Sequence, residues 1–202
     1  MTLPLRHSFF FRLVLATGAC FLLMLLALGG AYAYVHGSGN FHEVEKGMVY
    51  RSSWLGAEGL EKAIARHGVK SVLNLCGEQP GKEWYEGEVT VSRRLGVKFV
   101  SLGLSANTAL DANQVAQLAD ALRDAPKPLL IHCRAGSDRT GLACALYVAS
   151  HGGSYRDAQD QLSLFYGHFP YLGSKSVAMD VTLERFFESV AGRRVAGQAG
   201  SR

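Results

Sequence analysis

Residues 128–141 read PLLIHCRAGSDRTG, and this stretch decides which fold and which chemistry the chain can support. The apolar run at 128–131 predicts a buried strand, and the pattern after Thr140 predicts a helix. Between them lies a loop that starts at Cys133 and carries Arg139 six positions later. A loop of this kind, leading into a helix N-terminus, can turn its backbone N–H groups toward a bound anion.

The residue types in this loop suit phosphate chemistry. Gly136 accepts a positive φ without steric cost, and Arg139 carries a planar guanidinium that can hold two phosphoryl oxygens at once. The inward N–H groups, the helix dipole and Arg139 favour the thiolate of Cys133, which makes this residue a candidate nucleophile. We therefore expect a phosphocysteine intermediate, with His132 orienting the loop and the Thr140 hydroxyl assisting departure of the sulfur.

The remaining loop residues are expected to cradle the phosphate. In order they are Arg134, Ala135, Gly136, Ser137, Asp138 and Arg139. One alternative is that Cys133 is only a small core residue at the end of a buried strand. A zinc site at His132 and Cys133 is disfavoured, because adjacent residues on a strand point to opposite faces and the sequence contains no Cys-x-x-Cys pair. No metal or cofactor is expected.

The pattern His-Cys-x-x-Gly-x-x-Arg-Thr-Gly at 132–141 resembles the signature of the cysteine-dependent protein tyrosine and dual-specificity phosphatase superfamily. The resemblance covers roughly Val44 to Val190. Three stretches are more similar to atypical dual-specificity and bacterial members, and to lipid phosphatases related to phosphatase and tensin homologue, than to the large receptor-type enzymes. These stretches are Asn74-Leu75-Cys76 with Glu78, Leu102 to Asn113, and Ser137-Asp138-Arg139-Thr140.

The resemblance implies a phosphomonoester hydrolase of the protein-tyrosine or dual-specificity type, with phosphotyrosine in proteins as the default substrate. A phospholipid or phosphoinositide headgroup is the alternative substrate, favoured by Asp138, by Arg134 in the cradle and by an adjacent membrane segment. An alternative of another class is a non-catalytic phosphate-binding or redox-sensing module. A rhodanese-type sulfurtransferase is disfavoured because its loop is shorter.

A cysteine phosphatase also needs an acid that protonates the departing oxygen. The resemblance places an aspartate on the loop after the strand that precedes the catalytic one, here Gly103 to Asn113. The early positions 104–106 hold Leu, Ser and Ala, and only Asp111 is acidic. Asp111 is equally a good helix cap. Asp138 is the rival, because in phosphoinositide and related phosphatases with a similar Asp-Arg-Thr ending the loop aspartate has been considered for this task.

Cys76 ends a strand that should lie beside the catalytic strand. Resemblance to lipid phosphatases implies that it can form a disulfide with Cys133, which would protect the nucleophile from over-oxidation. The alternative is a buried strand-end cysteine, and Cys144 and Cys20 are also interpreted as structural. Tyr166, His168 and Tyr171 are expected to pack the last helices rather than to shape the pocket.

The N-terminal segment is apolar and distinct from the rest of the chain. Leu13 to Val35 contains no charged residue and is long enough to span a bilayer as a helix. Arg6 and Arg12 before it predict an N-terminus inside the cell and a catalytic domain outside, in the periplasm of a bacterium. The alternative is a cleaved signal peptide with Ala31-Tyr32-Ala33 as its cleavage site, which would release a secreted protein.

The 202 residues leave room for one domain of about 150 residues besides this segment. The net charge of +4 is modest and does not indicate nucleic-acid binding, and nothing indicates an oligomeric state. Strand patterns alternate with helical ones, which predicts an α/β fold with a central, mostly parallel sheet flanked by helices. The expected divisions are an anchor or signal peptide at 1–35, a linker at 36–43, the catalytic domain at 44–190 and a flexible tail at 191–202.

Overall fold

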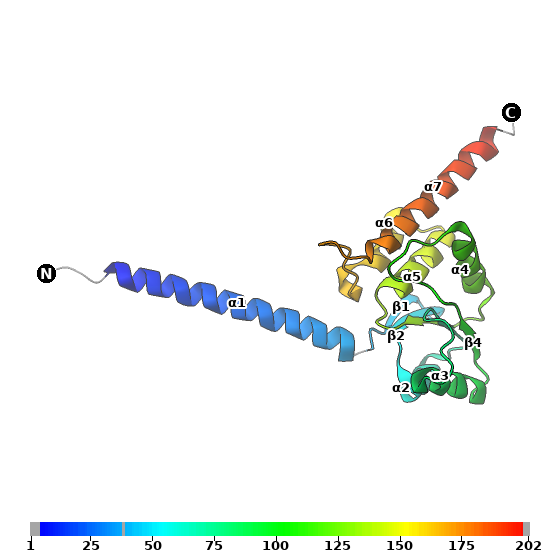
Figure 1. Ribbon diagram of the computed structural model, residues 1–202, viewed down its shortest axis with the longest axis horizontal. Coiled ribbons are helices and arrows are strands. Elements are labelled where there is room, and N and C mark those ends of the chain that lie inside the picture. The colour runs from blue at the N-terminus through cyan, green and yellow to red at the C-terminus, as the bar shows by residue number, and fades with distance from the viewer. Residues whose placement is uncertain (1–4, 38, 200–202) are drawn as a thin grey trace. The chain divides into compact units, whose positions relative to one another are not determined.

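The computed structural model describes residues 5–37 and 39–199, and the chain divides after Ser38 into two compact units (Figure 1). In the first unit, helix α1 (Leu5–Gly37) contains the stretch Phe11–Gly30, which has a mean hydropathy of 2.3 and no burial. This stretch is long and apolar enough to cross a membrane, and both a membrane anchor and a signal sequence have this length and composition.

The second unit, from Gly39 onward, is built on a mixed sheet. Its described strands are β1 (His42–Glu45), β2 (Val49–Ser53), β3 (Ser71–Asn74), β4 (Lys98–Ser101) and β5 (Leu129–Cys133). They lie in the order β1-β2-β5-β3-β4, and the last four run parallel while β1 pairs antiparallel with β2. The predicted mostly parallel sheet is confirmed.

Helices cover both faces of this sheet (Figure 1). Along β5, Leu129 and Ile131 pack into one core cluster, and Leu130 packs into the other. The alternation follows from the two-residue period of a strand. The smaller cluster involves α2 (Gly56–His67) and α3 (Glu83–Arg94), and the larger one involves α4 (Ala112–Asp124), α5 (Asp138–Ser150), α6 (Tyr155–Gln159) and α7 (Val177–Ala199).

The sheet register brings three loops together at the carboxyl ends of β2, β5 and β3. Ser53 at the end of β2 pairs with Cys133 at the end of β5, and Asn74 at the end of β3 pairs with His132. Because these strands are parallel, the chain segments that follow them leave the sheet at the same end. In open α/β sheets, ligands bind at the carboxyl ends of the strands.

Two boundaries differ from those expected from sequence. The second unit begins at Gly39, and the stretch expected to be a linker at 36–43 includes a fully buried Asn40 and part of β1. At the other end, α7 continues to Ala199, into the stretch expected to be a tail. The expected segments at 1–4 and 200–202 lie outside the described residues.

Candidate active site

The loop after β5 packs directly against the end of β2. Cys133 is the last residue of β5 and is only 2% exposed. Gly136 has a φ of +74°, and a Cβ at this position would lie 2.7 Å from the carbonyl carbon of Ser52 and from the nitrogen of Ser53. Only glycine satisfies both the positive φ and the close approach. The positive φ expected for Gly136 from the sequence is therefore present, and the packing of the loop against β2 requires it.

Arg139 lies in the first turn of α5, with one edge of its guanidinium fixed. Its Nη1 donates hydrogen bonds to the carbonyl oxygens of Leu75 and Leu104, at 3.2 and 3.4 Å. Its buried Nε has no hydrogen-bond partner among the described residues. Part of the guanidinium is thus fixed by the loops after β3 and β4, and an unused N–H donor is left for an oxyanion.

Two side chains that are distant in sequence bind the carbonyls of the loop. Asn40 Nδ2 donates to the Ala135 carbonyl at 3.0 Å, and Arg51 Nη2 donates to the Gly136 carbonyl at 2.9 Å. Both side chains are fully buried. Sequence analysis placed Asn40 in a linker.

His132, immediately before the nucleophile, faces a buried carboxyl group. Its Nε2 lies 3.4 Å from Oε2 of Glu88 on α3, and both residues are about 1% exposed. Burial lowers the pKa of His132 to about 4 and raises the pKa of Glu88 to about 7. A desolvated environment favours the uncharged form of each group. Neither ring nitrogen of His132 has a hydrogen-bond partner within the described residues. Sequence analysis did not identify Glu88.

Asp138, the acidic residue of the loop, is bound by a histidine. His168 lies between two carboxylates, with Nδ1 at 2.7 Å from Asp138 Oδ1 and Nε2 at 2.9 Å from Asp180 Oδ2. His168 is 1% exposed. Burial lowers its pKa, but the hydrogen bonds to Asp138 and Asp180 outweigh that effect, so the pKa of His168 is raised. His168 thus connects the loop to α7, whereas the sequence predicted only helix packing for it.

Asp111 is the N-cap of α4. Its Oδ1 accepts the backbone N–H of Gln114 at 2.8 Å, and the Gln114 side chain accepts the N–H of Asp111 at 3.1 Å. Asp111 is solvent-exposed, and its loop reaches the catalytic region through the Leu104 carbonyl that binds Arg139. The cap predicted from sequence is present. Within the described part of the chain, the other carboxylate oxygen of Asp111 has no hydrogen-bond partner, and the residue is exposed to solvent.

The other predicted residues of the loop differ in how deeply they are buried. Thr140 is fully buried, and within the described structure its Oγ1 has no hydrogen-bond partner. Arg134 is exposed, with its guanidinium carbon 5.8 Å from the centre of the Trp54 ring. Ser137 is buried and its carbonyl accepts the N–H of Gly141, so it belongs to the start of α5.

Cys76 lies just beyond β3, bridged to Gly103, and is half-buried. Burial raises the pKa of its thiol, Arg139 acts in the opposite direction, and the charge of Cys133 adds to the increase. The structure therefore places Cys76 in the electrostatic field of both Arg139 and Cys133. Neither Cys76 nor Cys133 is in a disulfide.

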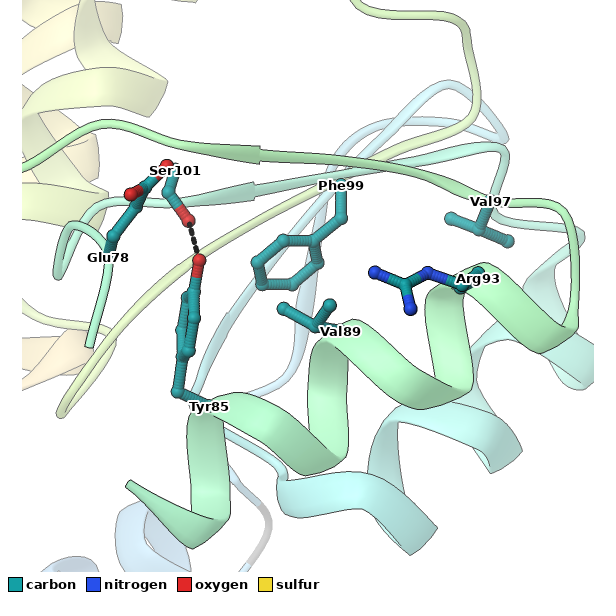
Figure 2. A pocket seen from close by; sticks show the side chains of 7 residues that line it. All are labelled: Glu78, Tyr85, Val89, Arg93, Val97, Phe99 and Ser101. Carbon is teal, nitrogen blue, oxygen red and sulfur yellow. Dashed lines mark hydrogen bonds between the residues drawn. The ribbon is translucent and has the colours of Figure 1, made fainter. Parts of the chain in front are cut away.

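A separate hollow of about 350 Å³ lies at the β4 edge of the sheet (Figure 2). Figure 2 shows Phe99 on its wall, with Glu78 and Arg93 at opposite ends, and the Ser101 hydroxyl 3.4 Å from that of Tyr85. Its lining contains no residue of the Cys133 loop. Glu78 therefore lies at this hollow, whose lining is separate from the Cys133 loop. In the described ranges 5–37 and 39–199, no group of three or more His, Cys, Asp or Glu side chains is arranged to hold a metal.

Residues 40–176 match the family described as "Swiss Army Knife protein, DSP-PTPase phosphatase domain" (PTP-SAK). The chain belongs to this phosphatase family. The match includes the strands β1 to β5, the loop from Cys133 to Arg139 and both segments that bind the loop carbonyls. The resemblance to cysteine-dependent dual-specificity phosphatases is confirmed, and the family acts on phosphorylated substrates.

Solved structures with the same fold include three phosphatases. P. aeruginosa TpbA, as a cysteine-to-serine variant in complex with phosphotyrosine, is 21% identical with a TM-score of 0.55, covering 72% of this chain and 83% of that chain. The catalytic core of the S. cerevisiae PP-IP phosphatase SIW14 is 24% identical with a TM-score of 0.55, covering 77% and 92%. Human DUSP28 is 20% identical with a TM-score of 0.51, covering 75% and 98%. A search of curated proteins finds no match.

Proposed function

We propose that this PTP-SAK phosphatase hydrolyses phosphomonoesters through a phosphocysteine intermediate. The observation that carries the proposal is the position of the Cys133 thiol at the start of a loop that ends in Arg139, whose Nε is unpaired. Cys133 Sγ attacks phosphorus and the bond from phosphorus to the leaving oxygen breaks. Arg139 and the loop amides hold the non-bridging oxygens as charge develops on them. Water then cleaves the sulfur–phosphorus bond and releases inorganic phosphate.

We assign proton transfer to Asp111, with Asp138 as the alternative. The acid protonates the leaving oxygen and, as a carboxylate, then accepts a proton from the attacking water. Asp111 uses one carboxylate oxygen in its helix cap and is open to solvent. Asp138 already has one carboxylate oxygen engaged by His168, so only its other oxygen is free to reach the leaving group.

The default substrate is a phosphotyrosine side chain in a protein. An aromatic surface near the loop supports this choice: Trp54 stacks on Trp84 with ring centres 4.6 Å apart, and Arg134 lies over Trp54. Such a surface can pack against the ring of an aryl phosphate.

A phosphorylated lipid headgroup is the second candidate, favoured by an exposed apolar segment beside the loop. This segment comprises Leu164, Phe165, Phe169, Tyr171 and Leu172, and Leu172 is 96% exposed. Asn40 connects it to the loop, because the amide that binds Ala135 also donates to the Tyr166 carbonyl at 2.9 Å. Exposed apolar residues beside a phosphate site suit a membrane surface.

The substrate classes are separated by their dependence on the apolar segment. Leu172→Ser should lower turnover of a phosphoinositide in vesicles about 10-fold and leave p-nitrophenyl phosphate turnover unchanged if lipid is the substrate. Leu95→Ser, at a distant exposed position on α3's C-terminal end, is the control. Equal turnover of the vesicle substrate by wild type and Leu172→Ser would leave phosphopeptides as the preferred class.

The intermediate is tested by acid quenching and mass analysis. Wild-type enzyme mixed with p-nitrophenyl phosphate should yield a phosphorylated peptide containing Cys133, and Cys133→Ser should yield neither that peptide nor turnover. Cys144→Ser is the matched control, since Cys144 is also a buried thiol and burial raises its pKa to about 11. Absence of turnover by wild type would overturn the proposed activity.

We also propose that α1 anchors the enzyme in a membrane, with the catalytic unit outside the cytoplasm. The apolar stretch Phe11–Gly30 and the preceding Arg6 support this arrangement. Protease added to sealed, right-side-out vesicles should remove the catalytic unit. A mature chain that begins after Ala33 would instead establish a cleaved signal peptide and a secreted enzyme.

A further inference from the structure

The anion nest expected for the Cys133 loop places a requirement on the carbonyl groups of that loop. When successive N–H groups face an anion, the carbonyls between them must find hydrogen-bond partners elsewhere. The partners of the Ala135 and Gly136 carbonyls are two buried side chains, Asn40 and Arg51. Asn40 lies just before β1 and Arg51 lies in the middle of β2, so neither belongs to the loop or its flanking helix.

Arg51 is unusual because its charge is buried without a counterion. Its side chain is fully buried, and none of the ion pairs in the described part of the chain includes it. Nη1 donates to the carbonyl and side-chain oxygens of Gln161 at 2.8 and 2.9 Å, and Nη2 donates to Gly136. A buried cation is costly unless it is paired. Here only uncharged oxygens accept its hydrogen bonds, so its positive charge has no counterion and lies against the loop.

Asn40 and Arg51 also connect the loop to the same neighbouring segment. The Arg51 guanidinium lies 3.6 Å from the centre of the Tyr166 ring, and Asn40 binds the Tyr166 carbonyl. A cation over an aromatic face is further stabilised by the ring electrons. The 161–166 segment therefore holds both side chains in the positions from which they bind the loop.

From these contacts we infer that Arg51 and Asn40 are positioning residues for the phosphate loop, and that Arg51 supplies a second, unpaired positive charge behind the bound phosphoryl group. Arg139 binds the phosphoryl oxygens directly, whereas Arg51 acts through the Gly136 peptide and through its electrostatic field. A low local dielectric strengthens such a field relative to water. The inference rests on the proposed phosphatase mechanism.

The charge of Arg51 and its hydrogen bonds can be tested separately. Arg51→Met removes both and should lower kcat about 100-fold and weaken inhibition by orthovanadate to a similar extent, with a smaller change in KM. Arg51→Lys retains the charge, so its kcat should be about 10-fold higher than that of Arg51→Met. Asn40→Ala should lower kcat about 10-fold, because the Ala135 carbonyl loses its partner.

Controls separate positioning from general stability and from the proposed function. Ser71→Ala removes a buried hydroxyl that bonds to Pro126 at the opposite end of the sheet, so it should change kcat less than 2-fold. Kinetics are compared on full-length protein shown to be folded by its thermal transition. A folded Arg51→Met enzyme with wild-type kcat and vanadate inhibition would overturn the inference. Wild-type protein that neither hydrolyses p-nitrophenyl phosphate nor binds orthovanadate would overturn the proposed function itself.

Discussion

Glu88 and His132 form a buried pair behind the nucleophile, with Glu88 Oε2 3.4 Å from His132 Nε2. Burial raises the pKa of Glu88 to about 7, although the backbone N–H groups of Leu55 and Gly56 oppose the shift. Burial also lowers the pKa of His132 to about 4. Between these two values both groups are uncharged, so one hydrogen bond can join them without a buried ion.

Glu88→Gln should remove a pH-dependent loss of stability. The folded pKa of Glu88 lies above its unfolded value near 4.5, so its favourable contribution is full below pH 4.5 and is lost as pH rises to about 7. The glutamine cannot ionise. We expect the variant to be more stable than wild type at pH 8, by on the order of 2 kcal/mol, with no such gain at pH 4.5.

Denaturant unfolding at both pH values measures this difference. Glu83→Gln is the control, because Glu83 is exposed on the same helix. A gain of equal size at pH 4.5 and pH 8 would show that Glu88 does not titrate as the structure requires. His132 has the opposite dependence: its folded pKa lies below 6.5, so the folded state loses stability as pH falls from 6.5 to about 4.

His168→Gln should destabilise the enzyme more at low pH than at high pH. The pKa of His168 is raised above 6.5 because its hydrogen bonds to Asp138 and Asp180 outweigh burial. Its contribution is therefore full below pH 6.5 and is lost as pH rises through the folded value. We expect a loss of about 2 kcal/mol at pH 6 and a smaller loss at pH 9.

Thermal unfolding at pH 6 and pH 9 checks this expectation, with His151→Gln as the exposed control. Because His168 binds a loop residue, the variant should also have a higher KM for p-nitrophenyl phosphate. The same loss of stability at both pH values would argue that His168 is neutral in the folded enzyme.

Much of the fold can be predicted from local patterns in the sequence. The apolar run predicts the strand β5, Gly136 predicts the tight loop, and the pattern after Thr140 predicts the helix α5. Together they place Cys133 at the carboxyl end of the central strand. The strand β1 was not expected. It has four residues, carries two glutamates and is alternately half-buried and exposed at the edge of the sheet, so its local signal is weak.

The supporting residues of the site have little local signal in the sequence. Arg51 and Glu88 are charged residues, which are rarely buried, and only the tertiary structure brings them against the loop and His132. Asn40 followed two glycines in a stretch that resembled a linker. A polar residue inside an otherwise buried strand, as at Arg51 in Val49–Ser53, is the one feature of the sequence that indicates such a role.

Mild peroxide should join Cys76 to Cys133. Burial raises the pKa of the Cys76 thiol, so it is not the first thiol expected to be oxidised, but it can condense with a sulfenic acid formed at Cys133. Mass analysis should find one linked peptide, and a reducing agent should restore activity. Cys76→Ser enzyme should lose activity irreversibly under the same treatment. Recovery of that variant to the wild-type level would remove Cys76 from this role.

Two substitutions at Asp111 separate its helix cap from its proposed proton transfer. Asparagine caps helices about as well as aspartate but cannot donate or accept the catalytic proton. Asp111→Asn should therefore retain wild-type stability and lower kcat about 100-fold for a phosphate ester with a poor leaving group. The loss should be much smaller for p-nitrophenyl phosphate, whose leaving group needs little protonation.

Asp111→Ala should lose the same activity and also about 1 kcal/mol of stability, because the N–H of Gln114 loses its acceptor. Asp138→Asn provides the comparison, since Asp138 is the alternative acid. The pH–rate profile decides between them, because removal of the acid abolishes the limb on which the protonated form is required. A wild-type profile for Asp111→Asn together with a lost limb for Asp138→Asn would transfer the role to the loop aspartate, and the bond to His168 would then hold the acid itself.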